Sequence, residues 1–490
     1  METLKALREA MPKQAIPAIE DCITRLYDVL PDKENLRNNT VLVCYGGGKD
    51  SAYTTAFMRA VHLGMAERHN GETFMLRIAT MRHAGMPYVV MQNIDRSYEA
   101  LGVYDDPNTE LLLIERNDVR PFERDLAMPQ TVISYNRIDH LMGGHRSFGD
   151  GRSTFCNACN LNVANSFGVV AGYDGGVDFI VTGDSPEEQT SYVLWMRSLA
   201  RKANLKIARG KSFQSTLETL NGLSRAYFKE IHGADNTPRI DERGVTYDVP
   251  ERLEFFSIYD DTEYEAGAHW SLLTEFMGFV FDDIAFSFTE SDCANPALMA
   301  HLRGLRTERV YKRTYDEGIG QYLDFALKLM EKKDFPPHLI DVMRERYSSQ
   351  AGTESMRSKA DQYALEALGL TNEQLVCMVY SPFAAQGEHL KSYLENEQPE
   401  LLKDEAEIRA MLAGERNTNL ELSAQLENIS GLSLTDLRHL YKGPLWSPFV
   451  PPQEEDGLLS TIMKTDPHQS RMLVATSADG NEMVDRVSGR

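Results

Sequence analysis

The sequence predicts an α/β protein in which a parallel β-sheet carries helices on both faces, followed by a helical C-terminal region. Up to about residue 182, short apolar runs alternate with segments of helical spacing, a pattern typical of strand–helix–strand units. From about residue 316 onward, helical spacing continues without such runs. With 490 residues, the chain is also too long for one ordinary core. Two or three domains are therefore expected.

Each element follows from a local pattern. A lead-in of helical spacing ends in the polar turn Asn38–Asn39, and Gly102 stops a later helix. The expected strands are 40–45, 74–80, 110–114 and 177–182, and the expected helices between them are 51–63, 88–101 and 160–171. The expected regions are a helical lead-in (1–39), a sheet domain with a CxxC insertion (40–315), a helical C-terminal domain (316–440) and an extended, partly disordered tail (441–490).

Composition restricts the class of protein. The chain has 42% hydrophobic and 25% charged residues, as globular proteins do. Its first residues lack the apolar stretch of a signal peptide, and no run approaches a membrane span, so a cytoplasmic protein without a membrane contact is expected. The formal net charge of −22 disfavours broad contact with nucleic acid. Two basic islands, around Arg197–Lys211 and Arg303–Arg313, are candidates for binding smaller anions.

The most informative segment is Gly46-Gly47-Gly48-Lys49-Asp50-Ser51, which directly follows the first apolar run. Three glycines before a helix bring bare N–H groups to its N-terminus, where unpaired donors and the dipole favour an anion. Lys49 adds a positive charge, and Asp50 and Ser51 can cap the helix or reach a magnesium ion. The spacing differs from the Walker loop and from the dinucleotide fingerprint. The segment therefore predicts a phosphate-binding loop of another kind.

Other loops are expected to converge on this one. In parallel sheets, ligands lie beyond the carboxyl ends of the strands. Thr80 ends the second expected strand and Arg82 follows it, and Gly183 and Asp184 follow the fourth. Asp184 is also a suitable helix cap before Pro186, so the sequence pattern alone does not distinguish a ligand-binding residue from a helix cap.

The cysteines form a second pattern. Cys156 and Cys159 have CxxC spacing, and Cys293 lies in a distant loop. Six cysteines in a chain without a secretory signal argue against disulfides, and a structural zinc would normally need a fourth ligand. Three thiolates are enough for a [4Fe–4S] cluster with one open iron. Zinc, a redox pair and inert thiols remain alternatives, whereas Cys22, Cys44 and Cys377 are expected to pack in the core.

These motifs resemble those of the PP-loop N-type ATP pyrophosphatases, also called adenine nucleotide alpha hydrolases. That family usually has Ser-Gly-Gly-x-Asp-Ser in its loop, and Gly46 stands in the place of the serine. The resemblance covers roughly residues 40–315 and implies a Rossmann-like, HUP-type doubly wound sheet. It implies ATP and Mg²⁺ as ligands, with Lys49, Asp50 and Asp184 in catalysis. The nucleotide contacts implied are Gly46, Gly47, Gly48, Lys49, Asp50, Ser51, Thr80, Arg82, Gly183 and Asp184.

The cysteine layout is similar to that of the iron–sulfur branch of PP-loop tRNA thiolases. This likeness implies that Cys156, Cys159 and Cys293 ligate a [4Fe–4S] cluster, with zinc as the alternative metal. The expected activity is adenylation of a carbonyl or amide oxygen, with release of AMP and pyrophosphate, and then sulfur transfer from a sulfur donor. Because the chain is acidic, a small-molecule, peptide or carrier-bound acceptor is favoured over tRNA.

Two other functions stay open. One is an amidotransferase or ligase of the same superfamily, which would use ammonia or an amine. The other is a nucleotide- and metal-binding regulatory or scaffold protein whose C-terminal region binds a partner. The proline-containing tail could also wrap another subunit of a homo-oligomer.

Overall fold

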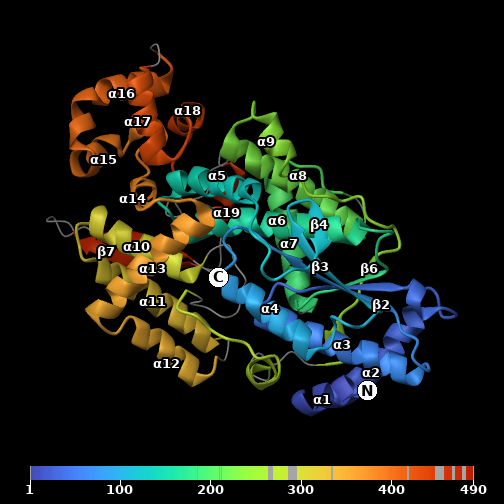
Figure 1. Cartoon of the computed structure of the whole chain (residues 1–490). Coiled ribbons are helices and arrows are strands. Elements are labelled where there is room, and N and C mark those ends of the chain that lie inside the picture. Colours follow the sequence, from blue (N-terminus) through green and yellow to red (C-terminus); the bar gives the residue numbers. More distant parts are fainter. Residues whose placement is uncertain are drawn as a thin grey trace.

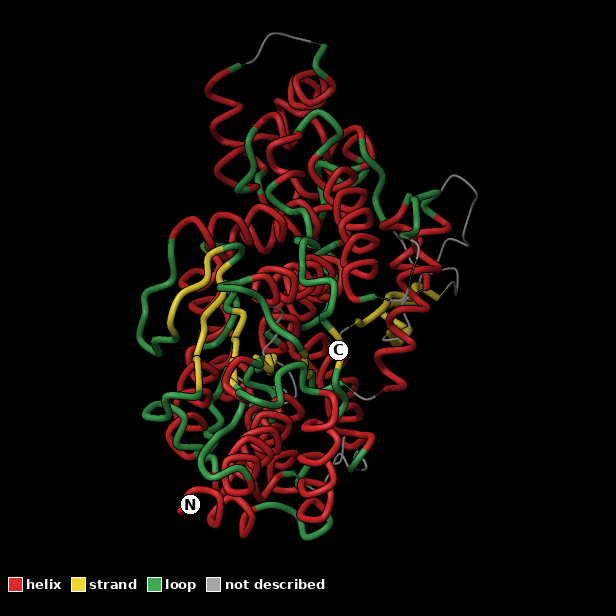
Figure 2. Tube along the Cα trace, turned by 90° about the vertical axis from the view of Figure 1, so that its right-hand side faces the viewer, coloured by secondary structure: helices red, strands yellow, loops and turns green. Residues whose placement is uncertain are grey.

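The computed structural model describes residues 2–184, 186–208, 210, 212–262, 269–284, 295–332, 335–415, 419–446, 457–465, 469–476 and 482–488. Helices predominate, and the strands of the main sheet lie at mid-height in both views, with helices above and below them (Figures 1 and 2). Within this described part, no helix is long and apolar enough to cross a membrane.

The core of the fold is a six-stranded, mostly parallel sheet, as expected for an α/β protein. Its strand order is β4-β3-β2-β1-β5-β6, and only β4 runs antiparallel to its neighbour. The strands are β1 (Thr40–Cys44), β2 (Met75–Met81), β3 (Thr109–Glu115), β4 (Asp118–Pro121), β5 (Phe179–Val181) and β6 (Glu254–Phe255). β4 and β6, at the two edges, were not predicted.

Helices cover both faces of this sheet, because side chains alternate between the two faces of a strand. In β1, Val41 and Val43 pack with α1–α4, whereas Leu42 packs with the helices of the opposite face. The first group is α1 (Glu2–Ala10), α2 (Ala15–Val29), α3 (Lys49–Arg68) and α4 (Tyr88–Ala100). The second group is α5 (Gln130–Ser147), α6 (Asn157–Gly172), α7 (Pro186–Lys202) and α8 (Phe213–His232), and the short helix α9 (Thr237–Asp241) packs on α8.

The helical C-terminal region is confirmed, and it lies to one side of the sheet (Figure 1). Its helices are α10 (Pro296–Arg309), which precedes the expected boundary at residue 316, α11 (Tyr315–Lys332), α12 (Pro337–Arg346), α13 (Gln350–Leu368), α14 (Asn372–Tyr380), α15 (Leu390–Glu397), α16 (Glu405–Ala413), α17 (Leu420–Ser430) and α18 (Leu434–Lys442). The later helix α19 (Leu458–Thr465) packs on α7 and α8. The described residues also form short helical segments: 3₁₀ helices η1 (Leu36–Asn38), η3 (Ile258–Asp260), η5 (Ala385–Gly387) and η6 (Pro399–Asp404), and π-helices η2 (Arg152–Cys156) and η4 (Leu272–Phe276).

The segment expected as an extended tail carries more structure than its sequence suggested. Besides α19, it forms the antiparallel hairpin β7 (Gln469–Thr476) and β8 (Glu482–Ser488). In β8, the buried Asp485 accepts a hydrogen bond from Tyr311 at 2.7 Å and pairs with Arg303 and Arg306. Two cations of the second basic island are therefore used inside the fold.

The same strand also reaches the segment that precedes the CxxC pair. Arg486 donates to Asp150 at 2.7 Å and to Ser153 at 3.3 Å, and its side chain is buried. The C-terminal hairpin is thereby tied both to α10 and to the turn that leads into α6.

Asp485→Asn is expected to destabilise the protein strongly, because it leaves Arg303 and Arg306 buried without their counter-charge. Losing one partner of a buried ion pair costs about 3–5 kcal/mol. Burial alone would raise the pKa of Asp485, but Arg306 and Arg303 lower it to about 2. Since an unfolded aspartate titrates near pH ~3.9, this stabilisation is present above about pH 4 and is lost as the pH falls towards 2. Urea unfolding at several pH values measures both effects.

Asp283→Asn is the matched control. Asp283 pairs with Arg346 and Lys359, but its side chain is 51% exposed, so the substitution should cost less than about 1 kcal/mol. Equal unfolding midpoints for the two variants at neutral pH would contradict a structural role for Asp485.

Candidate functional site

The glycine loop lies at the carboxyl end of β1 and leads directly into α3. Gly47 has φ +79°, and a Cβ there would lie 2.6 Å from Val90 of α4, so only glycine fits this turn. Among the described residues, the amides of Gly46, Gly47 and Gly48 donate no hydrogen bond. Three backbone donors are therefore gathered beside a helix N-terminus, as anion binding requires.

The strand order places this loop where ligands bind in open parallel sheets. β2 follows on one side of β1 and β5 on the other, so the order reverses at β1. Gly183, at the end of β5, lies against the first turn of α3: a Cβ there would be 2.9 Å from the Asp50 carbonyl carbon and 2.9 Å from the Ser51 nitrogen. The structure thus brings the two loops together.

Lys49 is the first residue of α3, and its side chain is buried at 1% exposure. Its Nζ is 3.3 Å from Asp50 Oδ1 and 5.8 Å from the centre of the Trp270 ring. A carboxylate and an aromatic face can both stabilise an ammonium group removed from water. The positive charge is therefore held at the first turn of α3, which directly follows the glycine loop.

Trp270 belongs to a pair of rings that sequence reasoning missed. Its neighbour His269 stacks on Tyr53 with ring centroids 3.6 Å apart. Burial lowers the pKa of His269 to about 4, and Lys49 contributes to the shift, so the imidazole is neutral at pH 7. Tyr53 follows Lys49 by four residues, which places both on one side of α3. That spacing was visible in the sequence, but nothing there indicated residues 269–270 as partners.

Asp184 lies on the exposed side of the same corner. Its amide is 3.4 Å from the Thr182 hydroxyl, and Gln189 donates to its carbonyl at 3.2 Å. Burial raises the pKa of the Cys44 thiol and the Asp184 carboxylate raises it further, which places this carboxylate near the end of β1. Asp50 and Asp184 thus come from two loops that touch, and oxygen ligands of this kind suit Mg²⁺.

The two residues expected at the end of β2 have structural partners; Thr80 lies within the strand, and Arg82 follows it. The Thr80 hydroxyl donates to the Tyr45 carbonyl at 2.8 Å, which links β2 to β1. Arg82 is buried, with Nε 2.6 Å from the Glu115 carboxylate, and Glu115 also pairs with Arg120 at 3.2 Å. In this conformation the side chain of Arg82 holds β2 to β3 and is not extended towards the glycine loop.

The CxxC pair lies on a continuous helical run formed by η2 and α6. Cys156 and Cys159 are buried at 4% and 7% exposure, and residues three apart share one side of a helix. They pack on the sheet face opposite to α3. Because α6 crosses back before β5, its N-terminal end lies towards the carboxyl ends of the strands. Any path between the pair and the glycine loop therefore passes around the edge of the sheet formed by the carboxyl ends of the strands.

A buried histidine lies next to this pair. The His140 ring contacts Phe155 with centroids 4.9 Å apart. Burial lowers the pKa of His140 to about 4, Asp139 opposes this effect, and His83 adds to it. Of the predicted metal ligands, Cys293 lies outside the described residues. Within the described ranges, no three His, Cys, Asp or Glu side chains are arranged to hold a metal ion.

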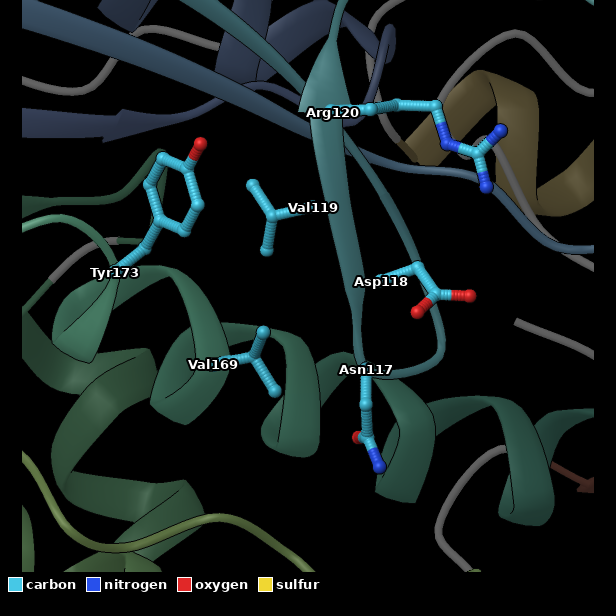
Figure 3. A pocket seen from close by; sticks show the side chains of 6 residues that line it. All are labelled: Asn117, Asp118, Val119, Arg120, Val169 and Tyr173. Atoms are coloured by element: carbon cyan, nitrogen blue, oxygen red, sulfur yellow. The ribbon is translucent and has the colours of Figure 1, made fainter.

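A separate surface pocket of about 520 Å³ lies at the edge strand β4 (Figure 3). It is lined by Asn117, Asp118, Val119, Arg120, Val169 and Tyr173. Val119, Val169 and Tyr173 face one another, whereas Asp118 and Arg120 point away from them (Figure 3). Since β2 and β3 separate β4 from β1, this pocket does not include any of the predicted site residues.

Comparison with known proteins does not assign the site. The chain matches no protein-family model, and no curated protein matches it.

Gly183→Ala should displace the glycine loop, since the new methyl group would press on the backbone of Asp50 and Ser51. Overpacking of this kind costs about 1–3 kcal/mol. We expect lower thermal stability together with at least about tenfold weaker pyrophosphate binding, measured by titration calorimetry.

Gly222→Ala, in α8, is the control because nothing lies within 4 Å of the added Cβ. It should leave binding unchanged and stabilise the helix by up to about 1 kcal/mol. If Gly183→Ala binds pyrophosphate as the control does, the contact between the two loops has no part in ligand binding.

Proposed function

We propose that the protein is an ATP-dependent enzyme of the PP-loop type, which activates an acceptor by adenylation. The observation that carries this proposal is the corner described above: three glycine amides without partners in the described part, with Lys49 beside them and Gly183 packed against the next turn. A mostly parallel sheet whose order reverses at that corner supports a Rossmann-like, HUP-type domain.

In the proposed first step, a carbonyl or amide oxygen of the acceptor attacks the α-phosphorus of ATP. A bond forms between that oxygen and phosphorus, and the bond from phosphorus to the bridging oxygen breaks, so pyrophosphate leaves with the electron pair. The glycine amides and Lys49 would bind and neutralise the departing phosphates. Asp50 and Asp184 would hold Mg²⁺, which offsets phosphate charge.

In the proposed second step, a nucleophile attacks the activated carbon and AMP leaves. We propose sulfur as that nucleophile, brought by a sulfur donor, with Cys156, Cys159 and Cys293 as ligands of a [4Fe–4S] cluster. Such a cluster would supply an open iron for sulfur. An acidic chain favours a small-molecule, peptide or carrier-bound acceptor over tRNA, and a cytoplasmic location fits reduced thiols.

One observation favours nitrogen transfer as the second candidate. The CxxC pair packs on the sheet face opposite to α3, so sulfur held there has to pass around the edge of the sheet to reach the glycine loop. In a ligase or amidotransferase, the cysteines would hold zinc or only pack, and ammonia or an amine would attack.

ATP should be cleaved between the α- and β-phosphates when an acceptor is present. Lys49→Met and Asp184→Asn should each lower kcat at least about 100-fold. The first removes the positive charge that would neutralise the phosphates, and the second removes a carboxylate that would hold Mg²⁺. Chromatographic analysis of the nucleotide products gives the cleaved bond, and thermal melting verifies the fold.

Asp118→Asn is the control, since Asp118 lies in the β4 pocket and not at the glycine loop. It should keep full activity. Formation of ADP and phosphate, or loss of activity in Asp118→Asn but not in Asp184→Asn, would overturn the assignment of the site.

The cysteine ligands are tested by metal content. Single serine substitutions of Cys156, Cys159 and Cys293 should each remove most of the iron from anaerobically purified protein and abolish its visible absorption. Cys22→Ala and Cys377→Ala, at two buried positions, should keep the metal and lose only packing energy. Zinc in place of iron supports the nitrogen-transferring alternative, and full metal content in all three serine variants contradicts both metal sites.

A further inference from the structure

Arg146, near the C-terminal end of α5, is a buried cation that the proposed function does not use. Its side chain is 3% exposed. Neither Nε nor Nη2 has a hydrogen-bond partner among the residues that the structure describes. Buried guanidinium groups are normally paired, because leaving them without acceptors costs much free energy.

The surroundings of Arg146 close over the guanidinium without satisfying it. A Cβ at Gly443 would lie 2.8 Å from Nη1 and 2.9 Å from Cζ, so the absence of a side chain there makes room for the group. The Trp446 ring lies 5.4 Å from Cζ, and the Trp446 amide donates to the Arg146 carbonyl at 2.8 Å. An aromatic face attracts a cation, but it does not accept the in-plane N–H donors.

The described acid whose charge acts on Arg146 is engaged elsewhere. Glu230, on α8, accepts the amides of Leu458 and Leu459 at 2.5 and 3.1 Å, and so caps α19. It acts on Arg146 only at longer range, because no ion pair forms between the two described side chains. Burial lowers the pKa of Arg146 to about 10 despite Glu230, and Arg146 contributes to the lowered pKa of His439. Arg146 is thus still charged at neutral pH, beside a neutral imidazole.

We propose that Arg146 binds a small oxyanion, a phosphate or a carboxylate, at the junction of α5, α8, α18 and residues 443–446. A guanidinium binds such groups through two parallel N–H···O bonds, and Nε with Nη2 form one such pair of donors. The site is distinct from the glycine loop. It joins a helix of the sheet domain to the C-terminal helices, so a bound oxyanion would stabilise their contact.

Thermal unfolding in phosphate, sulfate and acetate tests this site. The salts are compared at equal ionic strength for the wild type and for Arg146→Met, which keeps the length of the side chain without its charge. Sulfate and phosphate stabilise most proteins through exclusion from their surface, so the difference between the two proteins is the readout. We expect at least one oxyanion to raise the Tm of the wild type by about 2 °C or more beyond its effect on Arg146→Met. Phosphate alone would identify a phosphate ligand, and acetate alone a carboxylate.

Two further variants serve as controls for the oxyanion response. Arg137→Met lies on the same helix, but Arg137 donates to Gly369, Gly431 and Gln374, so this variant should lose stability and keep the full oxyanion response. Lys49→Met removes the charge of the glycine loop and should leave the response that depends on Arg146 intact. The proposal is overturned if wild type and Arg146→Met respond equally to all three salts, or if Lys49→Met removes the difference. The first outcome would mean that water or a carboxylate of the chain already satisfies Arg146. None of these outcomes depends on ATP cleavage.

Discussion

The position of the glycine loop depends on one close backbone contact, between Gly183 at the end of β5 and the first turn of α3. Because the strand order reverses at β1, the loops after β1 and β5 have no strand between them and can meet. Glycine at position 183 lets the backbones approach, and glycine at position 47 lets the turn pass under α4. Lys49, Asp50 and Asp184 take their places from this packing.

Phosphate binding at this corner has to overcome the strongly negative charge of the whole chain. The chain has a net charge of −22, which repels phosphates at long range, so binding has to come from local donors. Lys49 is buried between Asp50 and Trp270, where charge interactions are stronger than in water. Lys49 directly follows Gly46, Gly47 and Gly48, whose amides are the candidate phosphate donors. Arg146 is also a buried cation, but its Nε and Nη2 lack hydrogen-bond acceptors among the described residues, whereas Lys49 lies beside the Asp50 carboxylate.

Sequence reasoning was reliable where a signal is local. The strands β1, β2 and β3 and the helices α3, α4 and α6 were predicted because apolar runs and glycines mark them. It failed where partners are distant in the chain. Arg303 and Arg306 suggested an anion-binding island, but they pair with Asp485, which belongs to a hairpin that was expected to be an extended tail. Trp270 and His269 carry no motif and became visible only through their packing on Lys49 and Tyr53.

The central claim is that the amides of Gly46, Gly47 and Gly48 bind phosphate with Lys49. A crystal structure of the full chain with magnesium and pyrophosphate tests it most directly. The account predicts phosphate oxygens within hydrogen-bond distance of these amides, at the carboxyl ends of β1 and β5. Pyrophosphate bound only at another place, such as Arg146 or the β4 pocket, or absent at saturating concentration, would contradict it.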